Sequence, residues 1–172
     1  GYEPQVVGAI WSMESINRNR RRDLPELERI VISIDPAVSD EPHSDETGIG
    51  CVGLGTDKRG YVLDDWSQKG TPKQWSTKAV ALYDKWNADA IVIEVNQGGL
   101  MCRHTLETAR PGIPIIEVRA SRGKHVRAEP ISSLYERDLI SHVSAYPELE
   151  EQMCKMTAGG YAGDGSPDRV DW

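Results

Sequence analysis

Acidic residues stand at the ends of two apolar, β-branched segments, where a hydrophobic core offers them no favourable place. Asp35 ends the first of these segments, and Glu94 ends the second. Two further acids, Asp168 and Asp171, lie close to the end of the sequence. Carboxylates that lie side by side repel one another unless they are protonated or share a cation, and Mg²⁺ and Mn²⁺ prefer such oxygen ligands. The pattern predicts a metal-binding carboxylate cluster, and the chemistry it implies is phosphodiester hydrolysis with two metal ions.

Each acid also has a plainer explanation. Asp35 precedes Pro36 and could be a turn residue. Glu94 has no turn role after four apolar residues, and its charge would be costly to bury without a partner. Asp168 could simply cap a helix and Asp171 could be a surface acid, but residues three apart share a helix face, so either one can ligate. Taken jointly, the acids favour the metal site, because strand ends in an α/β sheet meet at one edge.

Basic residues concentrate in two segments, 18–22 and 119–127, although the net charge of the chain is -7. This net charge argues against a protein that coats nucleic acid, since phosphate binding needs positive potential. Basic residues around an acidic centre fit a nuclease, and solvated loops are the alternative. Lys124 is expected either near the scissile phosphate or in an ion pair with Glu129 or Asp138. The candidates for DNA contact are Arg119, Arg122, Lys124 and Arg127.

The spacing of apolar residues predicts the elements that would position these acids. Three alternating segments with a turn at 58–60 predict an antiparallel meander, and the strand and helix alternation that follows predicts parallel strands beside it. Thr71 and Pro72 begin a helix that continues to Trp86 and buries one apolar face. The expected strands are 29–35, 47–55, 61–66, 90–94, 113–119 and 139–143, and the further expected helices are about 100–109, 128–137 and 147–156. The fold class is therefore α/β, a mixed sheet flanked by helices.

The bulk composition predicts one intracellular domain. A chain of 172 residues with 38% hydrophobic content can build one substantial core. Neither a membrane-spanning apolar segment nor a signal-peptide pattern is visible, so no membrane partner is expected. Cys51, Cys102 and Cys154 are far apart and odd in number, which predicts buried, reduced thiols rather than disulfides or a zinc site.

Residues 1–28 have little strand patterning and an arginine-rich middle, which is typical of a linker or an arm. Ile10, Trp11, Met13 and Ile16 could form a short apolar helix face that docks onto another element. The sequence has no glycine-rich Walker loop, so it shows no ATP site.

Several motifs in order along the chain carry a family resemblance. They are Ile32-Ser33-Ile34-Asp35-Pro36-Ala37, Ser44-Asp45-Glu46-Thr47-Gly48, Ile93-Glu94-Val95-Asn96-Gln97-Gly98-Gly99, Arg127-Ala128-Glu129-Pro130-Ile131 with Leu134-Tyr135-Glu136, Glu148-Leu149-Glu150-Glu151-Gln152-Met153, and Ser166-Pro167-Asp168-Arg169-Val170-Asp171. With these motifs, almost all of residues 29–172 resembles the nuclease domain of phage terminase large subunits.

The resemblance implies a ribonuclease H-like fold for residues 29–172. It implies that Asp35, Glu94 and Asp171 are the catalytic, metal-binding triad, that Asp168 is an accessory acid, and that two Mg²⁺ or Mn²⁺ ions bind. It also implies that residues 1–28 are the hinge from an ATPase domain of the same polypeptide, and that the helix carrying Asp171 is truncated at the end of this sequence.

The function implied by the resemblance is endonucleolytic cleavage of concatemeric viral DNA before and after genome packaging. The implied partners are double-stranded DNA, the portal protein and the small terminase subunit, and the implied location is the host cytoplasm during virion assembly. Two alternatives remain open. One is a junction-resolving or RNA–DNA hybrid nuclease of the same fold, and the other is a noncatalytic domain that docks on the portal or on DNA.

Overall fold

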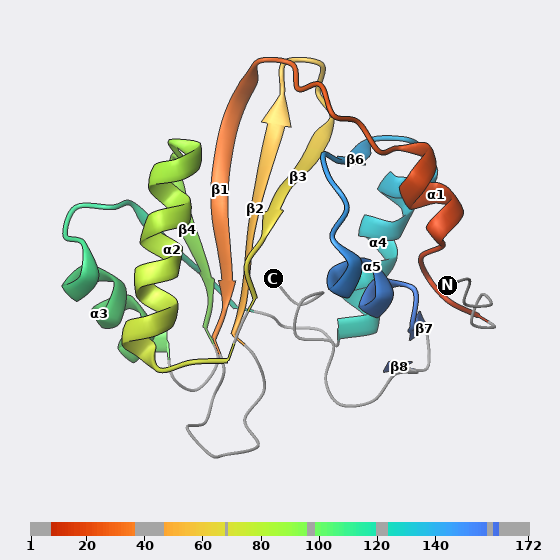
Figure 1. Ribbon diagram of the computed structural model, residues 1–172. Helices are drawn as coiled ribbons and strands as arrows, with labels where there is room; N and C mark the ends of the chain where they lie inside the picture. Colours follow the sequence, from red (N-terminus) through yellow and green to blue (C-terminus); the bar gives the residue numbers. More distant parts are fainter. Residues whose placement is uncertain are drawn as a thin grey trace.

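The computed structural model describes residues 8–36, 47–67, 69–95, 99–119, 124–157 and 160–161, with the backbone alone for 99–100, 124–127 and 160–161. A six-stranded sheet lies at its centre, with helices on either side (Figure 1). The strands of this sheet are β1 (Leu27–Asp35), β2 (Gly48–Gly55), β3 (Gly60–Asp65), β4 (Ala90–Glu94), β5 (Ile115–Val118) and β6 (Ile140–His142), and a separate pair consists of β7 (Met156–Thr157) and β8 (Gly160–Tyr161). The helices are α1 (Met13–Arg18), α2 (Pro72–Trp86), α3 (Gly99–Ala109), α4 (Lys124–Glu136) and α5 (Pro147–Met153).

The strand order is β5-β4-β1-β2-β3-β6. The strands β1, β2 and β3 form an antiparallel meander, whereas β4 pairs parallel to β1, β5 parallel to β4, and β6 parallel to β3. The expected mixed sheet is therefore confirmed. The hairpin between β2 and β3 closes with Lys58 at a φ of 65°, a left-handed conformation typical of such turns.

Element boundaries differ from the expected ones mainly in the last third of the chain. The helix α4 begins at Lys124, four residues before the expected start at Ala128, so Pro130 lies inside the helix rather than in its first turn. Ala128 and Tyr135, on either side of the proline, are both buried, so one face of this helix packs against the second core across the position of the proline. The helix α5 ends at Met153 rather than at 156, because Met156 and Thr157 form β7 instead.

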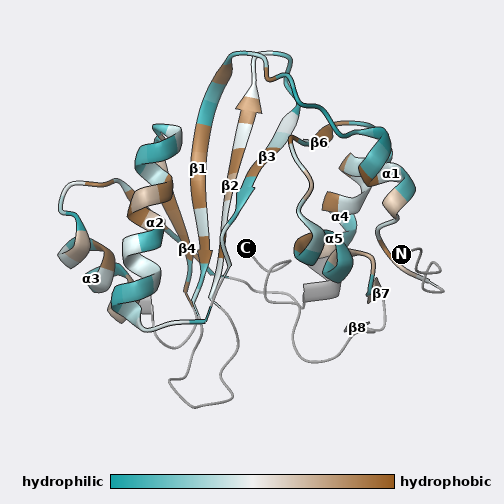
Figure 2. Cartoon of the chain, in the orientation of Figure 1, coloured by the Kyte–Doolittle hydropathy of each residue, from teal (hydrophilic) through white to brown (hydrophobic). Residues whose placement is uncertain are grey.

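The first hydrophobic core lies between the sheet and the helices α2 and α3. Ile32 and Ile34 of β1 and Ile91 and Ile93 of β4 are buried in it, and the helices contribute Trp75, Ala79, Leu82 and Leu106. Figure 2 shows brown, hydrophobic stretches along the strands of the sheet, and a mixture of brown and teal residues on α2. The start of α2 is fixed by a capping box, in which Thr71 and Gln74 accept from each other's backbone N–H groups.

The second hydrophobic core lies on the opposite face of the sheet, under α1, α4 and α5. Trp11 and Ile16 are buried in this core, so the apolar face expected near the N-terminus docks within the chain, although Met13 is exposed. Tyr135, Leu149 and Met153 come from α4 and α5. From the described part of the sheet, this core takes Val52, Val62 and Ile140.

The three cysteines are free thiols, as expected, but only Cys51 is fully buried, while Cys102 and Cys154 are half-buried. Burial raises the pKa of Cys51 to about 12 and that of Cys154 to about 11. Among the described residues, no helix is both long and apolar enough to cross a membrane.

Candidate functional site

The pairing of β1 with β4 brings Asp35 and Glu94 to the same edge of the sheet. The two strands are parallel, with Ile34 opposite Ile93, and each ends at the next residue. Adjacent strands lie about 4.8 Å apart. The two carboxylate-bearing residues are therefore next neighbours at the carboxyl ends of parallel strands, where ligand sites of α/β sheets form.

The face of the sheet on which these acids lie follows from strand alternation. Ile34 and Ile93 are buried against α2 and α3, so Asp35 and Glu94 lie on the other face. On that face the edge strand β5 presents Ile116 and Val118, which are 39% and 43% exposed. The acids therefore belong to the half of this face that the second core leaves accessible within the described structure.

The neighbours of the acid pair on β2 and β5 are a glycine, an exposed valine and an arginine. On β2, Gly48 pairs with Asp35, so no side chain stands beside the acid on that strand. On β5, Val118 pairs with Glu94, and the exposed Arg119 follows at the same edge. Burial and the negative charge of Asp35 together raise the pKa of Cys102 on α3.

Two neighbouring carboxylates suit a hard divalent cation, because they supply oxygen ligands and their mutual repulsion falls when a cation binds between them. Within the described ranges, no group of three or more His, Cys, Asp or Glu side chains is placed to hold a metal ion. By the chemistry of its oxygen ligands, the pair fits part of a metal site.

The other predicted site residues are only partly covered by the structure. Asp168, Asp171 and Arg122 lie outside the described residues. Lys124 and Arg127 are described by their backbone, in the first turn of α4, which begins at the end of the molecule toward which β1 runs (Figure 1). Of the two ion-pair partners considered for Lys124, Asp138 binds Arg18 instead, with an Nε to Oδ1 distance of 2.9 Å.

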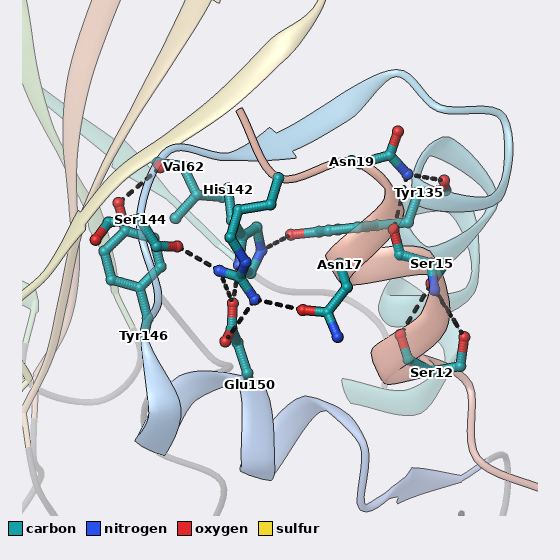
Figure 3. A network of polar contacts seen from close by, with 11 residues as sticks. Ser12, Ser15, Asn17, Asn19, Val62, Tyr135, His142, Ser144, Tyr146 and Glu150 are labelled. Carbon is teal, nitrogen blue, oxygen red and sulfur yellow. Dashed lines mark hydrogen bonds and ion pairs between the residues drawn. The ribbon is translucent and has the colours of Figure 1, made fainter. Parts of the chain in front are cut away.

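A buried polar cluster that the sequence did not predict lies on the other side of the fold, between α1, α4, β6 and α5 (Figure 3). His142 is 0% exposed, and its Nδ1 lies 2.7 Å from Oε2 of Glu150, which is 4% exposed. Its Nε2 lies 2.7 Å from the hydroxyl of Tyr135. Arg20 donates to both carboxylate oxygens of Glu150, at 2.8 and 3.0 Å. We call Arg20, Tyr135, His142 and Glu150 the His142 cluster.

Both ring nitrogens of His142 have a partner within the cluster, the Tyr135 hydroxyl at Nε2 and Glu150 at Nδ1, and the negative charge of Glu150 is matched by Arg20. Burial would raise the pKa of Glu150, but the hydrogen bonds from His142 and Arg20 outweigh it and hold that pKa below its ordinary value. The sequence offered one signal for this cluster, a histidine within an apolar edge strand followed eight residues later by an acid.

The family comparison matches most of the chain. A family model described as the terminase RNaseH-like domain matches residues 32–171. This span begins within β1 and includes Asp35 and Glu94. The helix α1 and Arg20 of the His142 cluster lie before it in the sequence. No curated protein matches the chain.

Solved structures of phage terminases share the fold. The large terminase nuclease from thermophilic phage G20c is 14% identical, with a TM-score of 0.65 over 95% of this chain and 94% of that chain. The nuclease domain of the large terminase subunit gp2 of bacterial virus Sf6 is 12% identical, with a TM-score of 0.60 over 86% of this chain and 81% of that chain. The HK97 bacteriophage large terminase is 10% identical, with a TM-score of 0.67 over 97% of this chain and 42% of that chain.

At these identities the solved structures establish the fold, and the family model establishes the family. The expected ribonuclease H-like α/β fold is confirmed, with the acid pair at the carboxyl ends of β1 and β4. This chain belongs to the terminase RNaseH-like domain family.

Proposed function

We propose that this chain is a metal-dependent DNA endonuclease domain that cleaves viral DNA during genome packaging. The observation that carries the proposal is the register of β1 with β4, which places Asp35 beside Glu94 on the accessible half of one sheet face. Family membership supports the nuclease assignment, because the solved relatives from phage G20c and virus Sf6 are terminase nucleases.

In this proposal Asp35, Glu94 and Asp171 hold two Mg²⁺ or Mn²⁺ ions, and Asp168 is an accessory acid. The adjacent carboxylates of Asp35 and Glu94 fit this role by their chemistry. The relative from G20c has been solved with magnesium and with cobalt, and the one from Sf6 with manganese. Cations at such a site supply the charge that stabilises an in-line displacement at phosphorus.

The DNA backbone would be held by basic residues around the acid pair. Arg119 lies exposed at the same sheet edge as Glu94, where its guanidinium can bind a phosphate. We assign the same role to Arg122, Lys124 and Arg127, with Lys124 nearest the scissile phosphate. Contacts to phosphates carry no sequence information, so the cleavage is expected to have little sequence preference.

We propose the larger assembly from the membership of the family. This chain spans 42% of the HK97 large terminase, which supports a further domain in the same polypeptide, and we infer that this domain is the packaging ATPase. Residues 1–28 would then connect it to the nuclease domain at 29–172. The portal protein and the small terminase subunit are the proposed partners in the host cytoplasm.

Conversion of supercoiled plasmid to nicked and linear forms tests the activity. The wild-type chain should cut in Mn²⁺ or Mg²⁺ and not in EDTA, and Asp35→Asn should abolish cutting. Asp84→Asn is the matched control, because Asp84 is an exposed acid of α2 that pairs with Arg110 far from the strand ends. Its cutting rate should stay within about twofold of the wild-type rate.

A second readout separates the metal site from the activity. A ligand that binds the folded state raises its melting temperature, so Mn²⁺ should stabilise the wild-type chain and Asp84→Asn, and should stabilise Asp35→Asn much less. Equal cutting by wild type and Asp35→Asn would overturn the proposal. Metal-independent binding to DNA without any cutting would instead favour the docking domain, and preference for branched DNA or an RNA–DNA hybrid would favour the alternative nuclease.

A further inference from the structure

The segment 9–21 packs across the second hydrophobic core, although the family match begins only at residue 32. We call this segment the strap. At its start, Ile10 N–H donates to the carbonyl of Met156 at 2.7 Å. In its middle, Trp11 and Ile16 are buried in the second core. The strap therefore closes a core whose remaining members come from α4, α5 and the sheet.

The end of the strap is bound through polar groups. The side chain of Asn19 donates to the carbonyl of Tyr135 at 3.1 Å, and Arg21 N–H donates to the carbonyl of His142 at 3.0 Å. Arg20 binds Glu150 through two nitrogens and also donates to the carbonyl of Ser144. These contacts join the strap to α4, β6 and α5 at one place (Figure 3).

Among these contacts, loss of the Arg20–Glu150 ion pair should destabilise the docked strap the most, because Glu150 is almost completely buried. A buried carboxylate that loses its counter-charge remains in a medium of low polarity, which is strongly unfavourable. The strap also contains an exposed ion pair, Arg18–Asp138, whose side chains are 44% and 52% exposed and which should contribute little.

We propose that the Arg20–Glu150 pair is a latch that holds residues 9–21 on the β6–α5 side of the fold, and that breaking it releases the strap while the sheet stays folded. The latch fixes the direction in which the chain enters the domain. The release is local because α2, α3 and the strands β1, β4 and β5 belong to the first core, which the strap does not enter.

Hydrogen exchange measured by mass spectrometry tests the latch. In Glu150→Gln, peptides covering 9–21 should exchange about tenfold faster or more than in the wild-type chain, and much faster than peptides of β1 and β4, which stay protected until the whole domain unfolds. Arg20→Met breaks the same pair from the other side and should give the same pattern. The matched control is Asp138→Asn, which makes the same acid-to-amide change in the exposed pair and should leave exchange in 9–21 within about twofold of the wild-type rate.

Two results would overturn the proposal. Unchanged exchange of 9–21 in both Glu150→Gln and Arg20→Met would show that the apolar contacts alone hold the strap. Exchange of 9–21 at the same rate as β1 and β4 in these variants would show that the strap is not a unit that opens by itself.

Discussion

Two pairs of charged residues in this fold differ in the sign of their charges: one pair consists of two acids, and the other of an acid and a base. Asp35 and Glu94 are like charges on neighbouring strand ends, an arrangement that becomes favourable when a cation binds between them. Arg20 and Glu150 are opposite charges in the interior, and they neutralise each other with His142 as a hydrogen-bond donor. The first pair is suited to binding a metal ion, and the second is suited to holding elements together.

The Glu150 pair predicts a specific dependence of stability on pH. Because the folded state lowers the pKa of Glu150, its contribution is fully present above the ordinary glutamate value of 4.5 and is lost as the pH falls through the lower folded pKa. At pH 7, Glu150→Gln should cost roughly 3 kcal/mol of unfolding free energy. Urea titrations of both proteins from pH 7 to pH 3 should show this difference shrinking below pH 4.5. A difference that stays constant over this range would contradict the role given to the ionised carboxylate.

The helix α2 shows how a single sequence signal fixes an element. The pattern Thr71-Pro72 and the apolar spacing after it predicted the start and the buried face of this helix. The structure confirms the start and buries Trp75, Ala79 and Leu82, while Trp86 is only partly buried. Local signals of this kind suffice because caps and periodicity act between residues that are close in the chain. The same reasoning placed β1 and β4 within two residues of their observed bounds.

The capping box of α2 can be tested with two threonines of the same region. Thr71→Ala removes the side chain that accepts from Gln74 N–H and should cost about 1 kcal/mol of unfolding free energy. Thr77→Ala is the control, because Thr77 is exposed inside the helix and bonds only the carbonyl of Lys73. That change should stay within about 0.5 kcal/mol of wild type. Urea unfolding checks both values, and equal losses would contradict the capping role.

Elements that depend on distant contacts were less predictable. The expected start of α4 at Ala128 lies four residues after the observed one, because the segment 124–127 is mostly basic and has no apolar periodicity that would predict a helix. The His142 cluster was missed because Arg20 meets Glu150 across 130 residues, and Arg20 had been grouped with its solvated arginine neighbours. Spacing in the sequence does not indicate such a contact, because it depends on how α1 docks.

At the scale of the whole molecule, the two hydrophobic cores lie on opposite faces of one sheet and have different effects on the acid pair. The first core, under α2 and α3, holds β1 and β4 in register, and thereby aligns Asp35 with Glu94. The second core covers the other face only over β2, β3 and β6 within the described structure, which leaves the acid pair accessible. The proximity of Asp35 and Glu94 was predictable from the strand-terminal acids, whereas the metal ligands expected from Asp168 and Asp171 stay a prediction.

The central claim is that Asp35 and Glu94 act as one metal-dependent centre for DNA cleavage. The most direct test is the rate of plasmid nicking in Mn²⁺ for wild type, Asp35→Asn, Glu94→Gln and the double variant. Residues that act as one unit are strongly non-additive, so each single variant should lose about a thousandfold or more and the double variant should lose no more than the worse single one. Near-wild-type nicking by either single variant, or losses that multiply in the double variant, would contradict the claim.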